Sequence, residues 1–165
     1  MDDIKFLEKI IRYQQNKNPL YPFQEHLLMQ LCIRVNKKIQ DDIVRRVSRY
    51  GINYSMYMVL IILLIENNHC LSPSEICKKL QFSRTNSTYI TDSLEKAGYI
   101  EKTDDREDRR GKKILLTSSG MFFIKKITLE QGIYLKIIWG SLSCDECELF
   151  ENFNKKLLMH FADVW

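Results

Sequence analysis

Residues 83 to 91, SRTNSTYIT, hold the polar side chains that most plainly suggest a binding surface. Most of them are weaker helix formers than alanine by about a few tenths of a kcal/mol each, so helix stability does not explain them. Hydroxyl, amide and guanidinium groups at the start of a helix are suited to contact base edges and phosphates. A solvated polar face is the alternative, and the neighbouring elements decide between the two.

A second cluster of charge lies in TDDREDRRGKK, residues 103 to 113. Its bases are close enough together to follow one stretch of phosphate backbone, and an arginine at a loop tip suits the narrow, negative minor groove. We expect the acids among them, Asp108 in particular, to stiffen the loop by pairing with a neighbouring arginine or loop amides. A solvated charge run without a partner is the alternative here.

Enzymatic chemistry finds little support in the sequence. His26, His69 and His160 lack metal-ligand spacing, and neither a glycine-rich phosphate loop nor a nucleophile motif is present. We therefore expect no enzyme, no cofactor and no metal site.

Cys144 and Cys147 form a Cys-x-x-Cys that Ser143 and Glu146 would place at a helix start, where thiolates are stabilised. A redox-responsive regulator thus remains an alternative function. Because no strand precedes this helix and no second cysteine pair is available for zinc, a surface coincidence is the better interpretation.

The elements around residues 83 to 91 follow a recognisable order. Ser72, Pro73 and Glu75 make a capping box with proline at the first helical position, which predicts a short helix. Only two residues then precede the cap Ser83, so the next helix follows after a tight turn, and Gly98 closes it. Short strands at 99 to 102 and 114 to 116 flank the charged loop. Helix, turn, helix and a basic hairpin predict a winged helix-turn-helix.

A helical wheel divides the second helix of this motif into two faces. The predicted core side carries Ile90, Leu94 and Ala97, joined by Ser83, Asn86 and Ser87, and the outer side carries Arg84, Thr85, Thr88, Tyr89 and Thr91. Asp92, Glu95 and Lys96 follow at the rear, away from the expected DNA. The predicted DNA contacts are Ser72, Ser83, Arg84, Thr85, Asn86, Thr88, Tyr89, Arg106, Arg109, Arg110 and Lys112.

Composition places the motif in one mainly α-helical domain with a small β-hairpin. The chain has 165 residues, is 45% hydrophobic and carries a net charge of +4 concentrated in a few segments. The longest apolar run, residues 56 to 65, is about half of the ~20 residues that a membrane span requires. We expect no signal peptide, no membrane association and, from five cysteines without framework spacing, a cytoplasmic location.

Both ends of the chain carry apolar stripes that predict self-association. One stripe contains Ile4, Leu7, Ile10 and Ile11, and the other consists of Leu149, Phe150, Phe153, Leu157, Leu158, Phe161 and Trp165. Monomers rarely expose such surfaces at both ends, although each stripe could instead fold back on its own core. We expect residues 1–50 and 121–165 to form a helical dimerisation region and 51–120 to form the winged helix-turn-helix lobe.

The segment DREDRRGKKILLTSSG resembles the wing signature of the MarR family, with Asp108, Arg109, Arg110, Leu116, Thr117 and Gly120 at the matching positions. SRTN followed by LEKAGYI is similar to that family's recognition helix. YPFQEHLLMQLCIRVNKKI with GIN resembles the EmrR (MprA) branch of multidrug-efflux repressors.

The resemblance implies a homodimer on double-stranded DNA with a pseudo-palindromic operator, and release by small lipophilic weak acids or phenols. The candidate ligand-binding residues are Tyr21, Phe23, His26, Arg34, Met56 and Tyr57. The function we expect is a transcription regulator, more specifically a ligand-released repressor. A winged-helix module that binds protein and not DNA is the alternative from another class.

Overall fold

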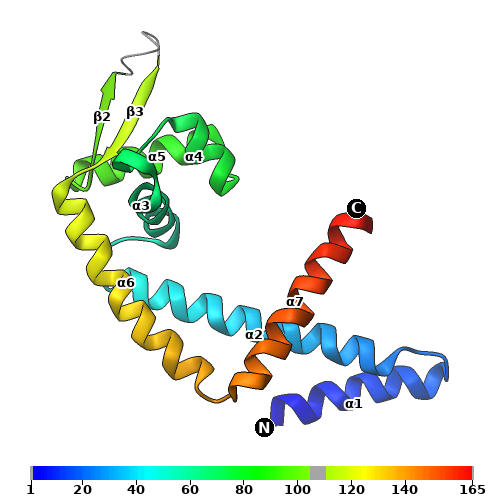
Figure 1. Cartoon of the computed structure of the whole chain (residues 1–165). Coiled ribbons are helices and arrows are strands. Elements are labelled where there is room, and N and C mark those ends of the chain that lie inside the picture. Colours follow the sequence, from blue (N-terminus) through cyan, green and yellow to red (C-terminus); the bar gives the residue numbers. More distant parts are fainter. Residues whose placement is uncertain (1, 105–110, 165) are drawn as a thin grey trace. The chain divides into compact units, whose positions relative to one another are not determined.

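The computed structural model describes residues 2–104 and 111–164 and divides into two compact units, Met1–Tyr57 and Met58–Trp165. Figure 1 labels most of its elements, which are mainly helices with one small sheet. In the described part of the chain, no helix is both long and apolar enough to cross a membrane. The elements are α1 (Asp2–Lys17), α2 (Phe23–Ser48), α3 (Tyr54–Ile65), η1 (Asn67–His69), β1 (Cys70–Leu71), α4 (Pro73–Leu80), α5 (Arg84–Lys96), β2 (Ile100–Asp104), β3 (Lys112–Leu116), α6 (Ser118–Trp139) and α7 (Cys144–Val164).

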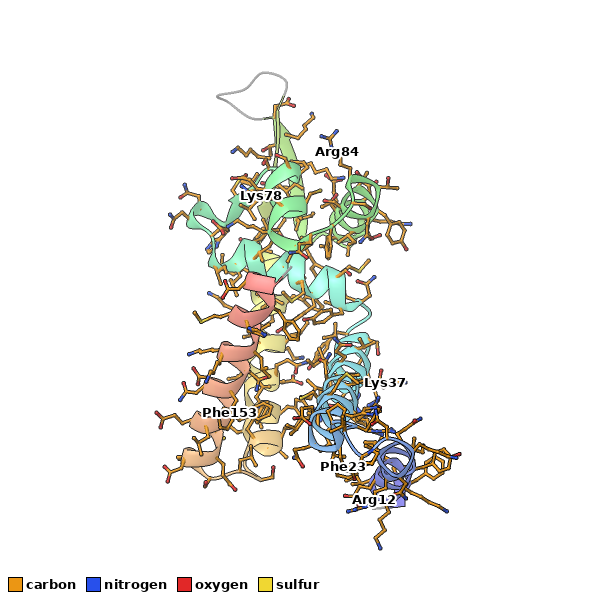
Figure 2. All side chains as sticks on the ribbon, turned by 90° about the vertical axis from the view of Figure 1, so that its right-hand side faces the viewer. Arg12, Phe23, Lys37, Lys78, Arg84 and Phe153 are labelled. Carbon is orange, nitrogen blue, oxygen red and sulfur yellow. The ribbon has the colours of Figure 1, made fainter. Side chains whose placement is uncertain are left out.

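The first unit is built on α1 and α2, which pack against each other. Its buried side chains include Leu7 and Ile11, one helical turn apart on α1, and Val47 on α2. The Arg12 guanidinium lies 5.0 Å from the centre of the Phe23 ring, a cation–π contact between the two helices that Figure 2 labels. The apolar residues of this segment recur at helical spacing and predict a helix over residues 22 to 49, and α2 agrees with that range within one residue at each end.

Gly51 lies just after the end of α2 and adopts the left-handed backbone conformation, with φ +75°. The side-chain oxygen of Asn53 accepts the N–H of Met56 at 2.8 Å, so Asn53 caps α3. Val59, Leu60, Ile62 and Leu63 of α3 are buried, so the apolar run at residues 56 to 65 contributes to the core.

The sheet has three antiparallel strands in the order β1-β3-β2, where the sequence predicted a two-stranded hairpin. β2 and β3 pair from Ile100↔Leu116 to Asp104↔Lys112, and Cys70 and Leu71 pair with Leu115 and Ile114 on the other edge of β3. The third strand escaped prediction because two residues are too few to show an alternating pattern.

The two helices of the predicted motif begin where expected. Ser72 and Glu75 form a complete capping box at α4, and the Ser83 hydroxyl accepts the N–H of Asn86 at 3.2 Å at the start of α5. Between them Gln81 adopts the left-handed conformation, φ 54°, which reverses the chain within the short turn. The helix-turn-helix is therefore confirmed.

The buried face of α5 is rotated relative to the predicted one. Ser87, Ile90, Thr91 and Leu94 are buried, whereas Asn86 and Ala97, expected on the core side, are exposed, as is the cap residue Ser83. Thr91 was expected on the outer face and is only 3% exposed. Its burial is tolerated because its hydroxyl donates to the carbonyl oxygen of Thr88 at 3.1 Å.

The sheet and α6 approach each other closely at their junction. Thr117 caps α6 by accepting the N–H of Gly120 at 3.0 Å, and its hydroxyl donates to the carbonyl oxygen of Gly98 at 2.8 Å. A Cβ at position 120 would lie 2.0 Å from the carbonyl oxygen of Tyr99, so only glycine fits. The Tyr99 ring stacks on Phe123 of α6 at 4.1 Å.

Much of the apolar surface predicted at the two ends of the chain is exposed. On α1, Ile4 and Ile10 are exposed, although Leu7 and Ile11 of the same stripe are buried. On α7 the six described members of the C-terminal stripe are all exposed, between 42% and 69%. Trp165 lies outside the described residues.

Candidate nucleic-acid interface

A groove of about 1090 Å³ separates α4, α5 and the strands of the sheet in the second unit. Its walls combine lysine and arginine side chains with serine and threonine hydroxyls. Figure 1 shows β2 and β3 projecting past α4 and α5, and Figure 2 labels Lys78 and Arg84 on these two helices. The lining residues include Ser72, Cys77, Lys78, Arg84, Ser87, Thr88, Lys102, Lys112 and Lys113.

The front of α5 is open to solvent. Arg84, Thr85 and Thr88 are exposed, and Tyr89 is 64% exposed. The first turn contains no acidic residue, so the positive end of the helix dipole remains unopposed by an acid of that turn. The Thr88 hydroxyl donates to the carbonyl oxygen of Arg84 at 3.0 Å and keeps lone pairs available to a base or a phosphate-bound water.

The described part of the wing brings Lys112 beside Asp104, its cross-strand partner. The two side chains form an ion pair of 2.5 Å in which both are more than half exposed. Such exposed pairs contribute about 0–1 kcal/mol, so a phosphate competes easily for the lysine. The predicted wing residues Arg106, Asp108, Arg109 and Arg110 lie outside the described residues.

Ser72, one of the predicted DNA contacts, caps the start of α4. Its hydroxyl donates to Oε2 of Glu75 at 2.7 Å, and its oxygen lies 3.3 Å from the Glu75 N–H that it accepts. The backbone N–H of Ser72 also donates to that carboxylate, and this bond, followed by the hydroxyl, lowers the pKa of Glu75. Ser72 lines the groove, so cap and phosphate contact would share one hydroxyl.

Several groove residues were not among the predicted contacts, and three of them are Lys78, Ser87 and Lys102. The Ser87 hydroxyl oxygen is buried and has no hydrogen-bond partner within the described part of the chain. Lys102 is held against the rear of α5 by Asp92 and Glu95. Lys78 could have been found from the polar face of α4, but the other two depend on packing between elements that local sequence does not reveal.

The predicted ligand residues, all in the first unit, are only partly brought together. The hydroxyl of Tyr21 and Nδ1 of His26 are hydrogen-bonded at 2.7 Å. Arg34 is exposed and lies eight residues further along α2, a rise of about 12 Å, so it does not join this pair.

Phe23, Met56 and Tyr57 are half-buried. Burial, and then the neighbouring Tyr54, raises the pKa of Tyr57. Its phenol is therefore a neutral hydrogen-bonding group.

At the other end of the chain, Ser143 and Glu146 form the predicted capping box of α7, with bonds of 2.8 and 3.2 Å. Cys144 is exposed and Cys147 is half-buried. Over residues 2–104 and 111–164, no three His, Cys, Asp or Glu side chains gather as a metal site.

Comparison with known proteins identifies the family. A model described as "MarR family" matches residues 50–111. The HTH-type transcriptional regulator PapX of Escherichia coli is 66% identical over 99% of this chain and 100% of its own length. The transcriptional repressor MprA of Escherichia coli K12 is 34% identical, over 92% of this chain and 86% of its own.

Among solved structures, a mutant MarR from Escherichia coli complexed with operator DNA superimposes with a TM-score of 0.68 at 26% identity. The match covers 79% of this chain and 93% of that one. The predicted resemblance to the MarR family and to MprA is confirmed, and so is the winged-helix fold class. Family membership also supports the expectation that the protein is not an enzyme. The chain belongs to the MarR family of transcriptional regulators.

Proposed function

We propose that this regulator acts as a homodimer that binds a pseudo-palindromic operator, represses transcription and is released by a small lipophilic or phenolic ligand. The observation that carries the proposal is the exposed, acid-free front of α5 beside a groove lined by lysine and arginine. In this arrangement Arg84, Thr85 and Thr88 face base edges and phosphates of the major groove. The wing, including Lys112 and the arginines of the charged loop, follows the adjacent backbone.

Dimerisation rests on the exposed apolar stripe of α7 and on the outer face of α1. Phe153, labelled in Figure 2, is 60% exposed, and Phe6 on α1 is 64% exposed. A second copy related by a two-fold axis would cover both surfaces and place two reading helices about 34 Å apart. One helical turn of DNA then separates the half-sites.

Release by a ligand is the regulatory part of the proposal. The hydrogen-bonded pair Tyr21 and His26 with the half-buried Phe23, Met56 and Tyr57 offers rings and hydrogen-bonding groups suited to a phenol. A ligand that favours a spacing of the two lobes unsuited to adjacent major grooves would lower the bound population. The protein would act in the cytoplasm, where its cysteines stay reduced.

A mobility shift with the DNA upstream of the protein's own gene tests the proposal, with and without salicylate. We expect a specific complex that salicylate weakens. Retention of both operator affinity and melting temperature in saturating salicylate would argue against release by such ligands.

Salt dependence separates a DNA-binding regulator from a winged-helix module that binds only protein. With about 6 to 10 phosphate contacts, affinity should fall by roughly three to five decades between 50 and 200 mM salt. DNA binding that is unaffected by peroxide and by serine at positions 144 and 147 would remove the redox alternative.

A further inference from the structure

Lys102 on β2 connects the reading helix to the wing through two acids on the rear of α5. Its ammonium group contacts Oδ1 of Asp92 and lies 3.1 Å from Oε2 of Glu95. Its backbone N–H donates to Oε1 of Glu95 at 3.2 Å. The helix is thus attached to the strand by a side chain and by the backbone of the same residue.

The burial of this cluster distinguishes it from an ordinary surface ion pair. The Lys102 side chain is only 26% exposed, whereas Asp92 and Glu95 are 60% and 42% exposed. Burial by itself lowers the pKa of Lys102, but the hydrogen bonds from its ammonium group to Asp92 and Glu95 outweigh that effect and raise it. The lysine is therefore charged at neutral pH, and one ammonium group shared by two carboxylates restrains the helix more than a single exposed pair does.

Because Lys102 lies on β2, its contacts with α5 also affect the position of the wing. β2 runs two residues further, about 7 Å, to Asp104, which pairs with Lys112 on β3. A change in the angle between α5 and β2 therefore moves the wing cation relative to the front of α5. Both must meet the same duplex for a sequence to be read.

We propose that Lys102 is a positioning residue for operator recognition, which fixes the angle between α5 and the wing by holding Asp92 and Glu95. The inference rests on the proposed DNA-binding function. Because Lys102 also lines the groove, a direct phosphate contact is the competing role. The two roles differ in their salt dependence and in their dependence on the acids.

The test uses the full chain and two duplexes of equal length: one that the wild type selects from a random pool, and a shuffled control. The ratio of the two affinities and the slope of log K against log salt are measured for wild type, Lys102→Met, Lys102→Arg and Asp92→Asn/Glu95→Gln. They are also measured for the triple variant that combines Lys102→Met with Asp92→Asn/Glu95→Gln. All are assayed well below their melting temperatures.

We expect Lys102→Met to lower the affinity ratio about tenfold with the salt slope unchanged, and Lys102→Arg to stay within about twofold of wild type. In the Asp92→Asn/Glu95→Gln background, Lys102→Met should have almost no further effect. A loss of fold alone would lower both affinities together and leave the ratio intact.

Three results would overturn the inference. An unchanged ratio in Lys102→Met does so directly. A second contrary result is a salt slope that is about 0.9 smaller in magnitude in Lys102→Met, with the same loss of affinity in the wild-type and the Asp92→Asn/Glu95→Gln backgrounds. That result would mean that Lys102 contacts a phosphate. Failure of the wild type to select any sequence removes the proposed function and the inference with it, whereas the first two results leave the proposed function standing.

Discussion

At the scale of single residues, Thr85 and Thr88 present their hydroxyls at the exposed front of α5. We expect Thr85→Ala or Thr88→Ala to change the preferred sequence by about 1–3 kcal/mol at the affected base pair, with the salt slope unaltered. Selection from a random pool, followed by salt titration on the selected duplexes, measures both quantities.

Lys112→Gln is the matched control in the wing. Loss of a phosphate contact should weaken binding to all sequences alike and reduce the salt slope by about 0.9. If Lys112→Gln instead altered the preferred sequence and left the salt slope unchanged, Lys112 would contact a base and not a phosphate.

Glu75 should give α4 a pH-dependent contribution to stability. Its folded pKa is lowered, chiefly by the backbone N–H of Ser72, so the ionised form is favoured in the folded state. The contribution is present above the unfolded pKa of about 4.3 and is lost as the pH falls through the folded value.

Urea unfolding at fixed protein concentration should find Glu75→Gln less stable than wild type at pH 7 by about a few tenths of a kcal/mol. The two proteins should converge once the pH has fallen below the lowered folded pKa of Glu75. A gap that persists there would mean that the carboxylate charge is irrelevant to the cap.

Residues whose roles are local were predictable, and those that depend on a distant partner were not. Ser72, Ser83 and Ser143 were identified as caps because a cap bonds to the residue three positions later. Lys102 escaped because its partners lie seven and ten residues away on another element.

At the scale of elements, Gly120 permits the close approach of α6 to Tyr99. Gly120→Ala would place a Cβ 2.0 Å from the Tyr99 carbonyl oxygen, so we expect a loss of more than about 2 kcal/mol of unfolding free energy. Thermal and urea unfolding report the change.

Gly132 in the same helix provides the control, because a Cβ there meets nothing within 4 Å. Gly132→Ala should stabilise the protein by up to about 1 kcal/mol through helix propensity. Equal effects of the two substitutions would contradict the close contact.

Helices were well predicted from periodicity, capping and glycine, since these signals are carried within each segment. The face of α5 was less well predicted, because Thr91 is buried through a hydroxyl bond to the Thr88 carbonyl that a polarity scale does not anticipate. β1 was missed because its pairing with β3 joins Cys70 to Leu115, far along the chain.

At the scale of the whole molecule, the stripe on α7 should decide the oligomeric state. Phe153 lies on the stripe and is 60% exposed, whereas Met159, on the opposite face of the helix, is 70% exposed. Sedimentation equilibrium should find Phe153→Glu monomeric or strongly weakened in association, and Met159→Glu unchanged.

The same two variants also test whether DNA binding depends on self-association. A monomer reaches one half-site, so Phe153→Glu should bind the selected duplex at least about tenfold more weakly than Met159→Glu does. A monomeric variant with full operator affinity would separate DNA reading from self-association. The sequence indicated the stripe, but a symmetric contact depends on the surface of a second copy, which no single segment encodes.

The hydrogen bonds of Thr117 hold the first turn of α6 against the base of the hairpin, and the lack of a side chain at Gly120 allows this close contact. Because this contact is close, we expect a displacement of the first turn of α6 to move β2 with it. A ligand or partner that displaced this turn of α6 would therefore be expected to reorient the wing as well.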